Sequence, residues 1–183
     1  INPNGEIDNS IILPQMYSGY ILQELFIDNF IGFSTAVVKK ECFDKAGCFD
    51  VNLPMAIDWD LWLRIACFYK FEYVNEHLLY YRYGHANMSR NTEKRIQCSD
   101  FVMERFMKKN REKLKKKTIK KAFQLTYNRR GAYYMNYNFF KGIYYLIKSF
   151  LIKPFQVAPV KIILKYFFNT IVRRNKLAIA IKQ

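Results

Sequence analysis

Apolar side chains recur at helical spacing in several parts of this chain. The plainest case begins at Asp58 and continues to about residue 69, with apolar positions on one face and Pro54 just upstream. The same spacing predicts short helices over residues 21–26 and 39–46. Gly47 follows the second of these, and glycine is the usual residue just past a helix end. The first half of the chain is therefore expected to contain at least three helices.

Other stretches of the first half favour strands, because β-branched and aromatic residues are enriched in them. These stretches are residues 11–13, 30–38, 71–74 and 78–83. A polar loop over residues 85–91 follows the last of them. The first half is thus predicted to mix helices with strands.

The second half is predicted to be helical throughout. A helix is expected from Thr92, and residues 118–136, 138–150 and about 160–173 again carry apolar residues three and four apart. Pro154 and Pro159 separate the last two stretches. Lysines interrupt every apolar run before it reaches the roughly 18 residues that a spanning helix needs. Residues 150–174 fit either a helix lying on a membrane or ordinary packed helices with a solvated basic face.

Composition and charge narrow the class of protein. The 183 residues fit one domain, or a domain with an appendage, and 51% of them are hydrophobic, which supports a real core. The printed sequence does not open on a charged segment followed by an apolar one, so no secretory signal is expected in it. The four cysteines form no CxxC pair and are expected to be buried thiols in a reducing compartment, which indicates a cytoplasmic protein.

The charges are divided unequally between the halves. Residues 1–90 contain 7 Lys or Arg and 11 Asp or Glu. Residues 91–183 contain 23 Lys or Arg and 4 Asp or Glu. No acidic residue follows Glu112, while 17 basic ones do. Such asymmetry predicts that the second half faces a polyanion, either a membrane surface or a nucleic acid.

The segment Asp58–Arg64 holds the most suggestive chemistry. Two carboxylates, a guanidinium and the chain's only tryptophans, Trp59 and Trp62, fall within it. A carboxylate in the first turn of a helix beside exposable aromatic rings suits acid/base work on a sugar or another polyol. The alternative is that Asp58 only caps the helix and both indoles lie in the core.

Residues 29–91 carry a series of motifs in a specific order. They are Ser34-Thr35, Gly47-Cys48-Phe49-Asp50, Asp58 to Arg64, and Tyr81-Arg82-Tyr83-Gly84-His85. In order and spacing they resemble the C-terminal half of the catalytic domain of an inverting, GT-A-fold family-2 glycosyltransferase. The resemblance implies an α/β fold over residues 1–91, followed by a helical basic extension over residues 92–183. The nucleotide-binding half of that family should precede these motifs, so the chain is expected to be a fragment that is inactive alone.

The resemblance also implies roles for individual residues. Asp58 would be the general base that deprotonates the acceptor hydroxyl, although Ile57 stands where many relatives have Glu. The acceptor side would be lined by Trp59, Asp60, Arg64 and Ser34. Asp60 is also placed to pair with Arg64 one helical turn further along, at i, i+4.

The donor diphosphate would be bound by Arg82 and Ser89. His85 would be a ligand to a divalent metal, Mg or Mn. That metal would be held mainly by an Asp-x-Asp motif upstream of these motifs, and residues 1–28 contain none.

The expected partners follow from the same resemblance. They are a nucleotide-sugar donor and a glycan or lipid-linked acceptor, with peripheral contact to the inner face of the cytoplasmic membrane through the basic half. The activity would serve polysaccharide or cell-surface glycan synthesis. A basic nucleic-acid-binding or partner-binding helical module without catalysis is the alternative. Aromatic residues among basic ones, as at Tyr127 to Arg130, favour it, but no known nucleic-acid-binding signature accompanies them.

Overall fold

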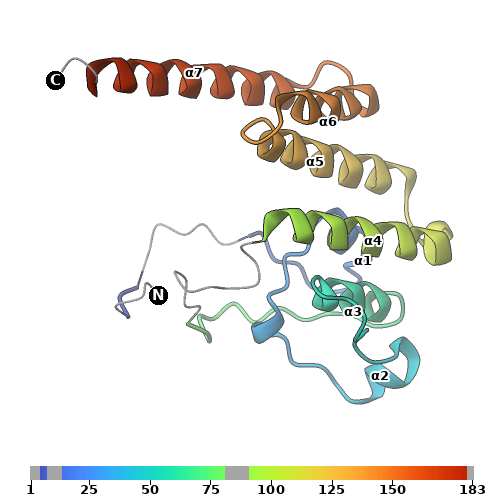
Figure 1. The fold of residues 1–183 in the computed structure, drawn as a ribbon. Coiled ribbons are helices and arrows are strands. Elements are labelled where there is room, and N and C mark those ends of the chain that lie inside the picture. Colours follow the sequence, from blue (N-terminus) through green and yellow to red (C-terminus); the bar gives the residue numbers. More distant parts are fainter. Residues whose placement is uncertain (1–4, 8–13, 81–90, 181–183) are drawn as a thin grey trace. The chain divides into compact units, whose positions relative to one another are not determined.

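The computed structural model describes residues 5–7, 14–80 and 91–180, with side chains to residue 172 (Figure 1). The chain divides into two compact units, Ile1–Thr118 and Ile119–Gln183. The boundary therefore differs from the division at residues 91 and 92 that the charge and the resemblance suggested. The helix that follows residue 91 belongs to the first unit.

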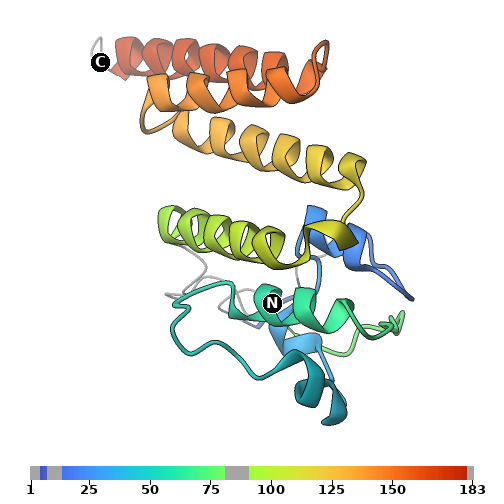
Figure 2. The same cartoon turned by 90° about the vertical axis from the view of Figure 1, so that its right-hand side faces the viewer.

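The first unit is built around one short central helix. The helices are α1 (Leu22–Ile27), α2 (Glu41–Ala46), α3 (Ile57–Ala66) and α4 (Thr92–Asn110), with 3-10 turns η1 (Phe33–Thr35) and η3 (Arg111–Lys113). Helix α3 contacts α1, α2 and α4 (Figure 2). Its Leu61, Trp62 and Leu63 are almost fully buried, as are Phe26 of α1 and Val102 of α4. This core fixes where α3 begins, and so where Asp58 lies.

Two helix ends in the first unit are explained by the residues that stand there. Gly47 ends α2 with φ 73°, a left-handed conformation that glycine adopts without a steric penalty. The Asn91 side chain accepts a hydrogen bond from the backbone N–H of Lys94 over 3.0 Å and so caps α4. The predicted helices at 21–26, 39–46 and from Thr92 are confirmed within a residue or two.

The α/β fold expected from the resemblance is wrong for this chain. The structure is 63% helix and 1% strand, and the described residues form no sheet. Residues 30–38 contain the 3-10 turn η1. Residues 71–74 and 78–80 form no strand, and Phe71 makes a single antiparallel bridge with Gly19. A strand persists only where a neighbour takes its ladder hydrogen bonds, and among the described residues only Gly19 and Phe71 exchange such bonds. The expected strand at 11–13 and residues 81–83 lie outside the described residues.

The second unit contains helices α5 (Lys116–Tyr134), which begins just before the boundary, α6 (Phe139–Ile152) and α7 (Val157–Ala180). Helices α5 and α6 cross closely at two glycines. A Cβ on Gly142 would lie 2.7 Å from the backbone nitrogen of Met135, and one on Gly131 would lie 2.4 Å from Leu146 Cδ2. Among the described helices, none is both long and apolar enough to cross a membrane.

Candidate functional site

The first turn of α3 presents Asp58. The residue before the helix, Ala56, has a left-handed backbone with φ 60°, which is uncommon for any residue other than glycine, asparagine or aspartate. Such strained positions gather at sites where the fold must aim a side chain. Asp58 is the second residue of α3 and stays partly exposed, whereas Trp59 to Leu63 behind it are buried. The start of α3 thus directs one carboxylate outward from a packed helix.

Asp58 is held from a separate segment by Asn29. The Asn29 Nδ2 group donates a hydrogen bond to Asp58 Oδ2 over 3.2 Å. The other end of the same amide, Oδ1, accepts from the backbone N–H of Ile31 over 3.3 Å, so the turn after α1 orients the amide. A neutral donor fixes a carboxylate without cancelling its charge. Asp58 is therefore oriented by an uncharged amide and not by a cation.

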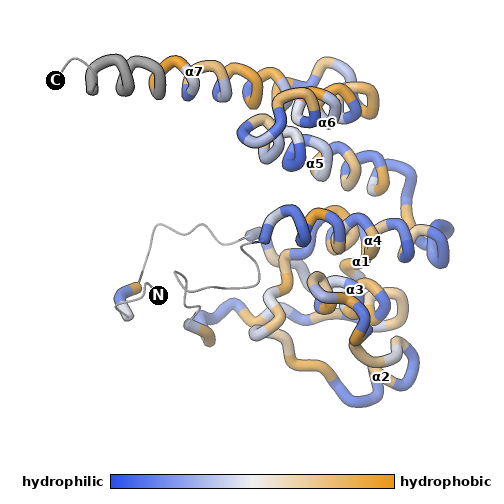
Figure 3. Tube along the Cα trace, viewed as in Figure 1, coloured by the Kyte–Doolittle hydropathy of each residue, from blue (hydrophilic) through white to orange (hydrophobic). Residues whose placement is uncertain are grey.

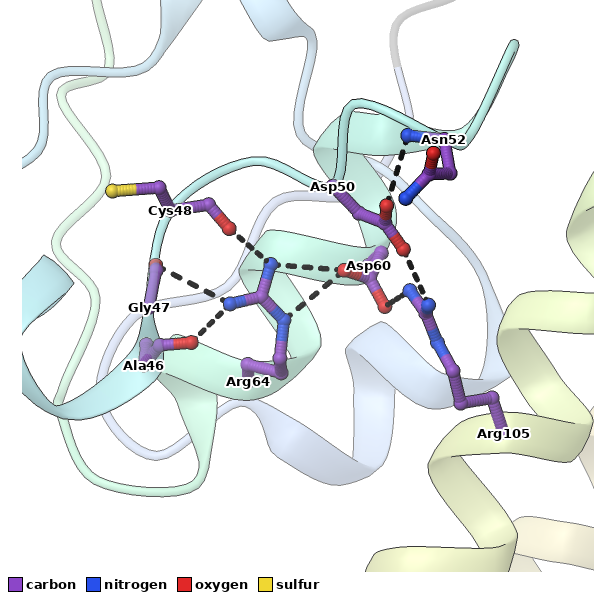
Figure 4. A network of polar contacts seen from close by, with 8 residues as sticks. All are labelled: Ala46, Gly47, Cys48, Asp50, Asn52, Asp60, Arg64 and Arg105. Atoms are coloured by element: carbon purple, nitrogen blue, oxygen red, sulfur yellow. Dashed lines mark hydrogen bonds and ion pairs between the residues drawn. The ribbon is translucent and has the colours of Figure 1, made fainter.

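Asp60, two residues further along α3, has a different environment (Figure 4). It is only 5% exposed, and its two oxygens bind two different arginines. Arg64 Nη2 lies 2.9 Å from Asp60 Oδ2, and Arg105 Nη2 of α4 lies 2.6 Å from Asp60 Oδ1. The pairing of Asp60 with Arg64 at i, i+4 is confirmed. Both oxygens of Asp60 therefore accept charge-assisted hydrogen bonds, which are stronger than those between neutral groups.

The two arginines extend the network to neighbouring loops. Arg64 donates to the backbone carbonyls of Ala46, Gly47 and Cys48, the last over 2.9 Å, so it fastens the turn after α2 to α3. Arg105 also pairs with Asp50, at 2.5 Å between Nη1 and Oδ2. The hydrogen bond from Arg105, helped by the Asn52 backbone N–H, lowers the pKa of Asp50. Burial opposes the charge of Arg105, but its hydrogen bonds to Asp50 and Asp60 outweigh burial and raise its pKa.

Both tryptophans lie in the core of the first unit. Trp59 donates from Nε1 to the Leu25 carbonyl over 2.8 Å, which ties α3 to α1. Trp62 is 2% exposed and packs edge-on against Phe49, at 6.4 Å between ring centroids. Within the described part of the chain its Nε1 group has no hydrogen-bond partner. The indoles support α3 from behind, and the role of Trp59 at an acceptor stays a prediction.

The remaining predicted site residues are not gathered around Asp58 by the described structure. Ser34 is exposed in η1, and no hydrogen bond between the described residues joins it to Asp58. Arg82, His85 and Ser89 lie outside the described residues. Over residues 5–7, 14–80 and 91–180, no group of three His, Cys, Asp or Glu side chains is placed to hold a metal ion. The predicted ligand His85 is not among these residues, so the divalent metal stays a prediction.

A shallow hollow lies in the first unit between α4 and the loop that precedes α3. Its volume is about 230 Å³, and it is lined by Asn52, Leu53, Pro54, Gln97, Cys98 and Phe101. Asp58 is not among the lining residues. The hollow is mainly apolar and offers one or two amide groups, which is less than a sugar ring requires for recognition.

Sequence reasoning did not identify two residues that organise this site. Asn29 lies in the loop after α1, and nothing in the local sequence distinguishes it. Arg105 lies 45 residues from Asp60 among other basic residues of α4. Asp50, the other carboxylate that pairs with Arg105, could be noticed in the sequence because it is the last residue of the Gly47–Asp50 motif.

Comparison of this chain with models of protein families, with curated proteins and with solved structures gave no match. The resemblance described above therefore rests on the motifs alone.

Proposed function

We propose that this chain carries the catalytic base of an inverting sugar transfer, with Asp58 as the base. The acceptor hydroxyl loses its proton to Asp58 while its oxygen attacks the anomeric carbon of a nucleotide-sugar. The bond from that carbon to the diphosphate breaks, and the nucleoside diphosphate leaves with the bonding electrons. A base positioned for this step accelerates transfer by about 10²- to 10⁴-fold.

The observation that carries the proposal is the contrast between the two carboxylates of α3. Asp60 is buried and bound by two arginines, whereas Asp58 is partly exposed and held by a neutral amide. Both oxygens of Asp60 are occupied by guanidinium groups in a buried position, so an acceptor hydroxyl cannot reach them. Asp58 is available for proton transfer, and it is also the residue that matches the base of the family motif.

The proposal concerns the activity and not the α/β fold, which the structure excludes for the described residues. The donor diphosphate would be bound by Arg82 and Ser89, with His85 at a divalent metal, as the motif order implies. Arginine and hydroxyl groups suit a diphosphate because they supply charge and directed hydrogen bonds. The acceptor would be a glycan or a lipid-linked glycan.

The reaction itself can be tested with the natural protein that contains this chain. Release of nucleoside diphosphate from a panel of nucleotide-sugars should depend on an added glycan or lipid-linked acceptor. Proton NMR of the product should show an anomeric configuration opposite to that of the donor. Retention of configuration would contradict a single displacement with Asp58 as base, and release without acceptor dependence would indicate a hydrolase instead.

A further inference from the structure

The outer side of α7 is apolar although it faces solvent. Its exposed apolar residues, each between 50% and 67% exposed, are Val157, Val160, Leu164, Phe167, Phe168 and Ile171. At 100° per residue they fall within an arc of about 100°. Tyr166 and Ile162 lie on the other side, where Tyr166 packs against Phe139 of α6 at 5.6 Å between ring centroids. Phe167, at the edge of the arc, also contacts Phe139, at 6.5 Å between ring centroids. Helix α7 therefore packs within the unit along one side and keeps a second apolar side that is exposed; Figure 3 shows the hydropathy of its residues along the chain.

The turn between α6 and α7 presents a further aromatic ring. Phe155 is 95% exposed, and its backbone is left-handed with φ 63°, an outlier for a bulky residue. The turn is anchored from inside by the next residue. Gln156 donates to the buried Ser149 hydroxyl over 2.9 Å and accepts from the side chains of Gln124 and Asn128. A buried polar network thus holds the turn so that Phe155 points away from the unit.

The charges around this apolar surface are all of one sign. Residues 119–183 contain 13 Lys or Arg and no Asp or Glu. Lys161 and Lys165 lie on α7 beside the apolar arc, and Lys153 lies in the turn two residues before Phe155; all three are exposed. Lysine stems can follow apolar surface while their amines reach a more polar layer. An apolar face bordered by lysines is typical of a helix that lies in the plane of a membrane interface.

We propose that the α6–α7 turn and the outer side of α7 dock on an anionic lipid bilayer, with Phe155 inserted among the acyl chains. The headgroups complement the lysines, and the acyl region takes the apolar residues that otherwise face water. A second copy of this unit would bring two basic surfaces together without an acid to neutralise them. A nucleic acid would engage the lysines and leave the aliphatic side chains of α7 in water. The surface lies in the second unit, so its binding is measurable whether or not the chain transfers sugars.

The test is co-sedimentation of the 183-residue chain with vesicles of phosphatidylcholine, with or without phosphatidylglycerol. Binding should require the anionic lipid and weaken as salt rises. Phe155→Gly should lower the partition coefficient by about tenfold, since one buried aromatic ring is lost. Glycine suits the left-handed backbone, so the melting temperature should not fall. Changing Lys161 and Lys165 together to Gln should also lower binding, by up to about 30-fold.

The matched control is Val51→Ser, which removes an exposed apolar side chain, 92% exposed, from the first unit. It should leave vesicle binding unchanged. Equal binding to neutral and anionic vesicles, or the same affinity for Phe155→Gly and the parent chain, would overturn the proposal. So would salt-sensitive binding to single-stranded RNA with no binding to vesicles, which would make the basic half a nucleic-acid surface.

Discussion

Arg105 and Asp60 join α4 to α3 through a contact of 2.6 Å between Nη2 and Oδ1. The two residues are 45 positions apart, and the same guanidinium reaches Asp50 in the loop before α3. One arginine on α4 thus holds both the helix that carries Asp58 and the loop that leads into it. The position of the candidate base depends on this pairing.

Replacing Arg105 should therefore destabilise the first unit. Arg105→Met leaves Asp60 with Arg64 alone and removes the partner of Asp50, so the free energy of unfolding should fall by about 1.5–3 kcal/mol, the range for hydrogen bonds to charged groups. Urea denaturation measures it. Arg95→Met, at an exposed position of the same helix, is the control and should change stability by less than about 0.5 kcal/mol. Equal effects of the two changes would show that the network adds nothing to stability.

The same network predicts a dependence of stability on pH. Hydrogen bonding from Arg105 holds the folded pKa of Asp50 below its unfolded value of about 3.9. The ionised form therefore stabilises the fold above that value, and this contribution is lost as pH falls from about 4 through the folded pKa. The Asp50→Asn chain lacks this contribution. The difference in unfolding free energy between the parent chain and Asp50→Asn should therefore shrink as pH is lowered below about 4. A difference that stays constant or grows in acid would mean that the pKa of Asp50 is not lowered by folding.

The helices could be predicted from the sequence because their signals are local. Gly47 ends α2, and Asp60 pairs with Arg64 one turn further along α3. Both features involve only residues that are close in sequence. The strands were predicted wrongly over residues 30–38 and 71–74, because β-branched and aromatic composition indicates only that a segment suits a sheet. Whether a partner strand exists depends on the rest of the fold.

The candidate site was predictable only in part for the same reason. The start of α3 and its carboxylates followed from the pattern. Asn29, Arg105 and the burial of Trp62 depend on how α1, α4 and α3 pack, and no spacing along the chain encodes those contacts. Nothing in the local sequence indicates the left-handed backbone of Ala56.

The close crossing of α5 and α6 gives a prediction for the second unit. Gly142→Ala places a Cβ 2.7 Å from the Met135 backbone nitrogen, which cannot move aside, so unfolding should become easier by about 1–3 kcal/mol. Gly32→Ala is the control, since its Cβ would meet Thr35 at an ordinary 3.4 Å. Thermal unfolding followed by circular dichroism compares them. A Gly142→Ala chain as stable as Gly32→Ala would mean that the two helices do not pack this closely.

Asn29 is expected to act as a positioning residue for Asp58. Asn29→Ala removes the hydrogen bond of 3.2 Å and lets the carboxylate turn away from the acceptor. The kcat for transfer should fall by about 2- to 12-fold, the equivalent of one hydrogen bond, while the KM for the donor stays the same. An effect on the donor KM alone would place Asn29 at the donor, and no effect on either constant would remove it from the site.

The central claim is that two carboxylates of one helix, Asp58 and Asp60, have separate roles in chemistry and in folding. Asp58→Asn and Asp60→Asn, made in the natural protein, test it when transfer rate and unfolding free energy are measured side by side. Asp58→Asn should reduce transfer by at least about 10²-fold and leave stability nearly unchanged. Asp60→Asn should lower the free energy of unfolding by about 3 kcal/mol, because two arginines lose their buried partner. Transfer near the parent rate in Asp58→Asn would contradict the account.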